Sequence, residues 1–222
     1  MKPIHPTLKK ILTSLLSLVL VLATTPLPDV LLQAQDQQTA PASSSGYTGQ
    51  GAPLTEQELE SLVAPIALYP DALVAQILSA STFPDQVAAA EYWMGQNKNL
   101  TGSALMQAAN GQSWDPSVKA LTQFPDVLNN MAQNISWTSQ LGEAYHNQSQ
   151  QVMAAIQTLR KQAQTAGNLK STPQQTVTTQ SQGGTQVVVI QPANPQVVYV
   201  PQYNPTVVYG TPYTTPGYST AA

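Results

Sequence analysis

The chain has 222 residues, with 8 Lys and Arg against 11 Asp and Glu, a formal net charge of −3, and no cysteine. This balance argues against nucleic-acid binding, which needs a basic surface to displace counterions. The lack of cysteine excludes disulfides, thiolate metal sites, a cysteine nucleophile and a lipidated cysteine.

Residues 1–34 are predicted to form a secretory signal peptide. Three lysines and no acid precede an almost wholly apolar segment, residues 11–23. A helix of that length rises only about 20 Å, less than the roughly 30 Å hydrocarbon layer of a membrane. A basic start, a short apolar middle and small residues at the exit are typical of a cleaved leader, with cleavage after Ala23 or Ala34. We therefore expect export and no transmembrane span after signal removal; the alternative is an uncleaved anchor.

Residues 35–53 are small and polar and are predicted to form a flexible linker, and residues 54–167 a helical domain. Thr55 and Glu58 have the spacing of a capping box, which predicts a helix start. Proline is tolerated at the first helical position, because its missing N–H would be unpaired there. Three aromatic-Pro-Asp corners therefore each predict a short helix preceded by a ring in the core; they begin at Tyr69, Phe83 and Phe124.

Residues 138–166 are predicted to form the longest helix, against which the short helices pack. Apolar and amphipathic residues recur three or four apart and form one face of it: Leu141, Tyr145, Gln148, Val152, Ile156, Leu159 and Ala163. Gly167 indicates its end. The fold class is therefore mainly α: a compact bundle of short helices around one long C-terminal helix, followed by a short β or extended Tyr-Pro repeat segment.

The end of the chain is divided into three parts. Residues 168–183 are predicted to be a polar linker, residues 184–213 three decapeptide repeats of β or extended structure, and residues 214–222 a disordered tail. The second and third repeats share Asn, Pro, Val, Val, Tyr and Tyr, and no charged residue follows Lys170. Each repeat reads as a proline corner followed by a short extended run of β-branched and aromatic residues.

Aromatic side chains are the candidate binding residues. The tyrosines of the repeats either face the helical domain or form a contact row for a partner groove or a glycan. The tryptophans either anchor the core or stack on a sugar, since a broad ring face suits both. The candidates are Tyr199, Tyr203, Tyr209, Tyr213, Trp114 and Trp137.

Few side chains suit catalysis, and we expect no cofactor and no metal site. His146 is the one histidine after the predicted leader, and no motif places a serine beside it. The acids at the proline corners, such as Asp71 and Asp126, suit the positive end of a helix; the alternative is a carboxylate cluster. An enzyme with a single catalytic carboxyl would rely on Glu143 or, second, on Glu91.

Several strings carry a resemblance to a known family. They include residues 68–73 (LYPDAL), 114–121 (WDPSVKAL) and 198–205 (VYVPQYNP), and the similarity spans about residues 54–210. The chain thereby resembles an uncharacterised bacterial envelope family, domain of unknown function 3300. The resemblance implies an exported, mostly helical protein that ends in a Tyr/Pro segment, and it transfers no catalytic residues. We expect the protein in the periplasm or outer envelope of a bacterium.

The sequence favours a non-enzymatic binding or structural module whose partner is a wall glycan (peptidoglycan) or an envelope protein. Export, the small number of reactive groups and the aromatic repeat support this hypothesis. One alternative is a peptidoglycan-acting hydrolase or lyase. Another is an outer-membrane assembly factor or chaperone, and the oligomeric state is open.

Overall fold

Short helices make up most of the fold, and a computed structural model describes them over residues 52–219. The predicted leader and nearly all of the first linker lie outside the described residues. The mainly α prediction is confirmed. In chain order the elements are α1 (Glu56–Val63), α2 (Asp71–Ser81), α3 (Pro84–Gln96), α4 (Gly102–Asn110), α5 (Pro116–Leu121), α6 (Pro125–Gln133), α7 (Ile135–Thr165), β1 (Gln175–Gln182), β2 (Thr185–Pro192) and α8 (Pro205–Val208).

The helix starts follow the predicted chemistry. Thr55 caps α1 in a complete capping box with Glu58, and α2, α3 and α6 begin at the three aromatic-Pro-Asp corners. Prolines occupy the first position of α3 and α6, where no N–H is needed. The prediction of a ring in the core before each corner was wrong for Phe83, which is 38% exposed. The other two corner rings are partly buried against the core.

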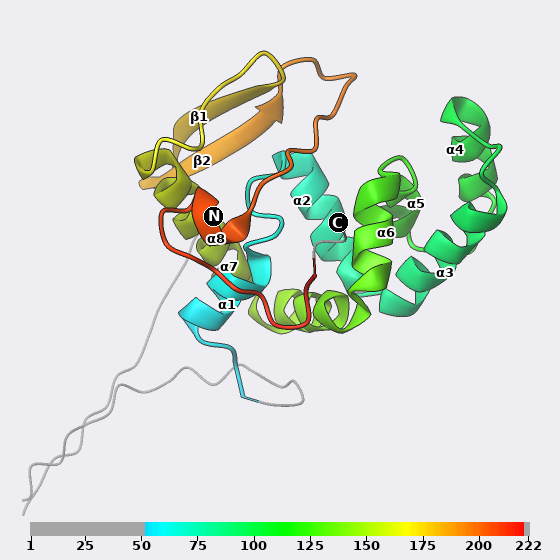
Figure 1. The fold of residues 1–222 in the computed structure, drawn as a ribbon, viewed down its shortest axis with the longest axis horizontal. Helices are drawn as coiled ribbons and strands as arrows, with labels where there is room; N and C mark the ends of the chain where they lie inside the picture. The colour runs from blue at the N-terminus through cyan, green and yellow to red at the C-terminus, as the bar shows by residue number, and fades with distance from the viewer. Residues whose placement is uncertain (1–51, 220–222) are drawn as a thin grey trace, which may run out of the picture. The chain divides into compact units, whose positions relative to one another are not determined.

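The helices are arranged along α7 (Figure 1). The group α3 to α6 lies at one side of the molecule, with α4 farthest out, while α1 and the β-hairpin lie at the other side. Between them, α2 contacts both α5 and α7. Large side chains that are almost completely buried come from most of these elements: Leu59, Leu73, Ile77, Leu78, Leu121, Leu128, Met131, Trp137, Leu141, Ile156, Leu159 and Ile190.

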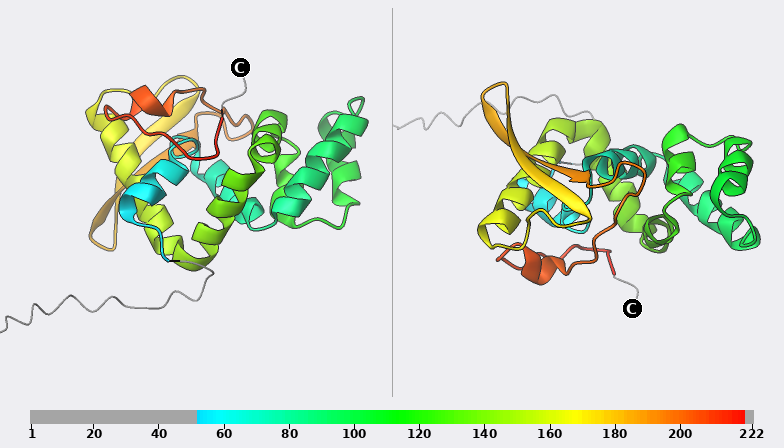
Figure 2. Two further views of the ribbon diagram at one scale, coloured as in Figure 1. Left: turned by 60° about the horizontal axis from the view of Figure 1, so that its bottom comes forward. Right: turned by 90° about the horizontal axis from the view of Figure 1, so that it is seen from above.

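The long helix exists as predicted but is bent. Gln148 has non-helical backbone angles (φ −133°, ψ 39°), and the two halves of α7 meet there at a steep angle (Figure 2). The Gln148 side chain pairs with the backbone of Leu54: its Oε1 accepts from Leu54 N at 2.9 Å and its Nε2 donates to Leu54 O at 3.0 Å. The bend lets the first half of α7 face α6 and the second half face the hairpin.

The predicted polar linker, residues 168–183, is in part a β-strand. β1 pairs antiparallel with β2, with Val177 opposite Ile190 and a turn at Gly183 and Gly184, which both have positive φ. The sequence did not predict this strand, because most of its residues are exposed Gln, Thr and Ser, which are also typical of a linker. β1 forms because β2 is buried on α7 and needs a partner for its backbone groups.

The three predicted extended repeats differ from one another. Only the first contains a regular strand, β2, and the third begins with the single turn of α8. Asn204 caps that turn by accepting from Thr206 N at 2.9 Å, and Pro205 stands at the first helical position. Residues 214–219 of the predicted disordered tail lie against the helices: Ser219 N donates to Asn134 Oδ1 at 2.8 Å. Residues 220–222 lie outside the described part.

Candidate functional site

Residues 194–219, here called the Tyr/Pro segment, lie across α1 and the turn at residues 64–69. Four rings form what we call the tyrosine cluster: Tyr69, Tyr203, Tyr209 and Tyr213. Consecutive rings meet edge to face, with centroids 6.0, 6.2 and 5.5 Å apart. Pairs of this geometry each contribute about 0.5–1.5 kcal/mol beyond burial, so the cluster fixes the segment to the helices.

Three hydroxyl groups of the cluster also form hydrogen bonds. Tyr203 and Tyr209 both donate to the carbonyl oxygen of Ala64, at 2.9 and 2.6 Å, and Tyr213 donates to Glu60 Oε2 at 2.7 Å. Burial raises the pKa of all four rings in the cluster. Three of the four repeat tyrosines therefore face the helical domain.

Arg160 connects the turn at residues 64–69, on which the Tyr/Pro segment lies, to the β-hairpin. Its side chain is 3% exposed. Nε donates to Ala67 O at 2.8 Å and Nη2 to Tyr69 O at 3.0 Å, while Nη1 donates to Val188 O at 2.9 Å and to the carboxylate of Asp71. The guanidinium thus connects α7, the start of α2 and β2 at one point. The sequence did not reveal this role, because the partners, three backbone carbonyls and one carboxylate, are far from Arg160 in the chain.

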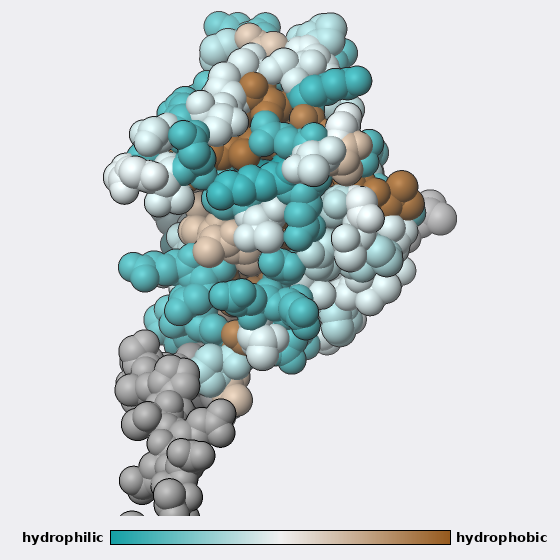
Figure 3. Space-filling view, turned by 90° about the vertical axis from the view of Figure 1, so that its left-hand side faces the viewer, coloured by the Kyte–Doolittle hydropathy of each residue, from teal (hydrophilic) through white to brown (hydrophobic). Residues whose placement is uncertain are grey.

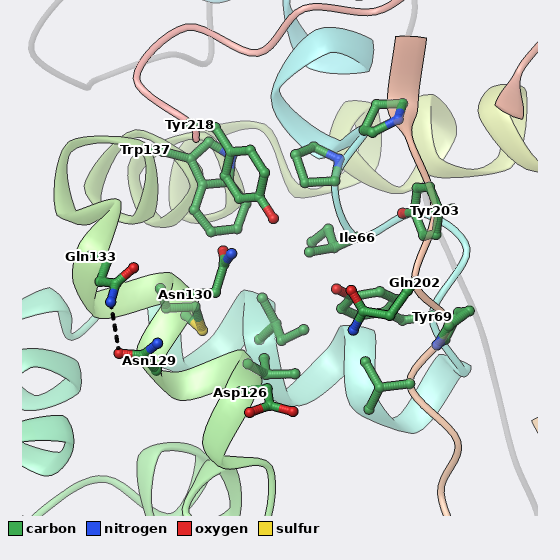
Figure 4. Close-up of a pocket in the computed structure, with 17 residues that line it drawn as sticks. Ile66, Tyr69, Asp126, Asn129, Asn130, Gln133, Trp137, Gln202, Tyr203 and Tyr218 are labelled. Atoms are coloured by element: carbon green, nitrogen blue, oxygen red, sulfur yellow. Dashed lines mark hydrogen bonds between the residues drawn. The ribbon is translucent and has the colours of Figure 1, made fainter. Parts of the chain in front are cut away.

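A cleft lies between α6 and the Tyr/Pro segment, and we call it the α6 cleft (Figure 4). Its volume is about 480 Å³. Rings of Trp137 and Tyr218 stand on one side and those of Tyr69 and Tyr203 on the other, with the amide of Asn130 below the ring of Trp137. Polar side chains of both walls line the space: Asp126, Asn129, Asn130, Gln133 and Gln202.

The lining of the α6 cleft combines ring surface with groups that form hydrogen bonds. Among the described residues that line it there is no Lys, Arg or His. Asn129 Oδ1 accepts from Gln133 Nε2 at 3.1 Å, and the ring of Tyr218 lies 4.9 Å from that of Trp137. Side-chain amides both donate and accept, so the cleft suits a neutral ligand with many hydroxyl or amide groups.

The structure brings two of the six predicted binding residues to this cleft, Trp137 and Tyr203. Trp137 is 1% exposed and its Nε1 donates to Leu62 O at 2.9 Å, so it also anchors the core. The remaining four lie elsewhere: Tyr209 and Tyr213 are in the tyrosine cluster, Tyr199 is 42% exposed, and Trp114 contacts the ring of Trp93. The polar side chains of the cleft carried no sequence motif that singled them out.

The candidate catalytic carboxyls are not brought together. Glu143 is exposed on α7. Glu91 lines a different hollow of about 540 Å³ between α3, α4 and α6, together with Lys98 and Asp126. His146 is exposed. Within residues 52–219 no group of three or more His, Cys, Asp or Glu is placed to hold a metal ion. None of the helices in that range is long and apolar enough to span a membrane.

The fold defines a helical domain with a hairpin and a tyrosine-rich segment bound across it. The chain belongs to the family described as protein of unknown function (DUF3300), which matches residues 55–221, so the resemblance seen in the sequence is confirmed. It is 46% identical over 122 residues to the uncharacterized protein YacH of Escherichia coli (strain K12). The match covers 55% of this chain and 20% of YacH, so the chain aligns with only a fifth of that relative. No solved structure matches the chain.

Proposed function

We propose that this protein is an exported, non-enzymatic module that binds a neutral glycan of the bacterial cell wall in the α6 cleft. The observation that carries the proposal is the lining of the cleft: side-chain amides and one carboxylate together with the rings of tyrosines and a tryptophan. The N-terminal sequence supports export.

Sugars present hydroxyl and N-acetyl groups around the ring and C–H groups on its faces. Amide side chains such as Asn129 and Gln202 can donate to and accept from the former, and Asp126 can accept from hydroxyls. Aromatic rings contact the C–H faces. No cationic side chain lines the cleft in the described part of the chain, so nothing there would neutralise a phosphate or a peptide carboxylate. We therefore expect such anionic groups of the wall to stay outside the cleft.

The cleft is also large enough and held in place. Its volume of about 480 Å³ is within the range of roughly 300–1,000 Å³ that ligand pockets occupy. Its second wall, with Gln202 and Tyr203, is fixed to the helices by the tyrosine cluster. A wall that is ordered before binding costs less entropy when the ligand arrives.

Binding can be tested with the full chain lacking its predicted leader. We expect it to sediment with purified peptidoglycan and to bind N-acetylglucosamine oligomers in calorimetry. Replacing Asn129 and Gln202 together by Ala should weaken binding about tenfold or more, the magnitude of one or two lost hydrogen bonds. The matched control replaces Gln150 and Gln151, which are exposed on α7 outside the cleft. No retention of the wild type, or equal loss in both variants, would contradict the proposal.

The same incubation tests the non-enzymatic part of the proposal. Wild-type protein should release no soluble muropeptides from the peptidoglycan. If fragments are released, and Glu143→Gln or Glu91→Gln stops their release, a hydrolase or lyase acting through that carboxyl replaces the binding module.

A further inference from the structure

The outer edge of β1 carries backbone groups that the chain itself does not use. Val188 and Ile190 of β2 direct their N–H groups away from β1, to Gln157 Oε1 at 2.7 Å and to Asp71 Oδ1 at 3.3 Å. Along an antiparallel pair, successive residues direct their N–H and C=O groups alternately toward the partner strand and away from it. Thr179 lies opposite Val188, and Val177 lies opposite Ile190. These two residues, and Ser181 two positions further along β1, therefore direct their N–H and C=O groups away from β2.

Some of these outward-directed backbone groups of β1 already form hydrogen bonds. Val177 N and O both pair with the Ser171 hydroxyl, at 2.9 and 3.2 Å, and Gln175 pairs with Thr172. Among the described residues, the outward groups of Thr179 and Ser181 have no partner. We call these four groups the β1 edge. They are accessible, because both residues are exposed and the hairpin tip extends beyond α7 (Figure 2).

The two edges of the hairpin differ in whether other parts of the chain cover them. The edge of β2 is covered by side chains from the helices, Gln157 and Arg160 from α7 and Asp71 from α2. The β1 edge has no such cover, and residues 177–182 contain no charge and no proline. Charges and prolines are the usual means by which proteins prevent edge-to-edge pairing.

The side chains around the edge do not offer a large apolar interface. Figure 3 shows the hairpin side of the molecule, where hydrophilic residues cover most of the surface and apolar patches are small. The available interaction is therefore the backbone pairing itself, supported by uncharged Thr, Ser and Gln side chains.

We propose that the β1 edge pairs with the same edge of a second copy of this chain across a two-fold axis. In the antiparallel register centred on Gln180, Thr179 of each copy lies opposite Ser181 of the other. All four open groups of each copy are then used, in four hydrogen bonds, and Val177 keeps its bonds to Ser171. The result is a four-stranded sheet in the order β2, β1, β1, β2.

A second copy fits this edge better than another strand for two reasons. The open groups form a self-complementary pattern, which is what a two-fold axis requires. Residues near such an axis face themselves, so a charge there would repel its own copy; the edge has none. Because few side chains are buried, the dimer should be weak, with a dissociation constant roughly in the 100 μM range.

Gln180 provides a decisive test, because in this register it faces Gln180 of the other copy without bonding to it. Its side chain is exposed, so Gln180→Lys and Gln180→Glu should leave the circular dichroism spectrum unchanged. Wild-type protein, without its predicted leader, should show a monomer–dimer equilibrium in analytical ultracentrifugation. Each variant alone should dimerise at least about tenfold more weakly, since like charges then face each other.

An equimolar mixture of the two variants should restore dimerisation at low salt. The control, Gln191→Lys, adds a charge to an exposed position on β2, away from the axis, and should behave as wild type. A wild type that stays monomeric up to millimolar concentration, or a mixture no better than either variant, would overturn the proposal. A dimer equally weakened by the control would overturn the register.

Discussion

Replacing Arg160 by Met should remove the main polar link between α7 and the hairpin. The substitution keeps most of the side-chain volume but removes every donor. Three backbone carbonyls, those of Ala67, Tyr69 and Val188, then lose their bond to the guanidinium, and Asp71 loses its cation. Val188 O keeps its bond from Gln157 Nε2 at 3.2 Å, but the carbonyls of Ala67 and Tyr69 are left unsatisfied. Unsatisfied buried acceptors are costly because water cannot reach them.

The expected loss follows from these contacts. Bonds to a charged group contribute about 1.5–3 kcal/mol each and are not additive, and breaking a buried ion pair from one side costs about 3–5 kcal/mol. Asp71 is 42% exposed and recovers part of its solvation in water, so its share is small. We expect about 4 kcal/mol, a large part of the 5–15 kcal/mol that stabilises a typical domain.

Urea unfolding followed by far-ultraviolet circular dichroism measures this loss. The control is Lys161→Met, at the exposed neighbouring position, which should change the free energy of unfolding by less than about 0.5 kcal/mol. Arg160→Lys should be intermediate, because an ammonium keeps the charge but cannot reach all the carbonyls at once. A loss below about 1 kcal/mol for Arg160→Met would show that the contacts of the guanidinium do not hold the hairpin.

Three further changes test the packing. Gly142→Ala should cost about 3 kcal/mol in urea unfolding, because the new Cβ would lie 2.0 Å from Ser81 O, whereas Gly95→Ala, with nothing within 4 Å, should stabilise α3 slightly. Tyr209→Phe should cost about 1 kcal/mol by removing the bond to Ala64 O; no change would mean that the hydroxyl is dispensable. Burial raises the pKa of the tyrosine cluster, so the folded state keeps protons that the unfolded chain releases above about pH 10. The contribution of the cluster to stability should be constant below that pH and fall above it, by up to about 1.4 kcal/mol per pH unit for each fully buried ring; equal urea midpoints at pH 8 and 11 would contradict this.

The sequence by itself determined where helices begin and which faces they bury. Capping and proline chemistry act within three or four residues, so Thr55 and the aromatic-Pro-Asp corners located α1, α2, α3 and α6 without tertiary information. The stripe along residues 138–166 likewise identified α7, because its period is a property of the helix alone. The bend at Gln148 was not visible, since it accompanies a pairing with Leu54, which is 94 residues away.

Only the tertiary structure decided what the polar and aromatic residues do. β1 was hidden because an exposed edge strand of Gln and Thr has the composition of a linker, and its pairing depends on where β2 is buried. From the sequence, the repeat tyrosines could either face the helical domain or contact a partner. In the structure Tyr203 and Tyr209 face the helical domain, where both donate to the carbonyl oxygen of Ala64. The α6 cleft exists because the Tyr/Pro segment lies opposite α6, and such a placement of distant segments leaves no periodicity to detect in the sequence.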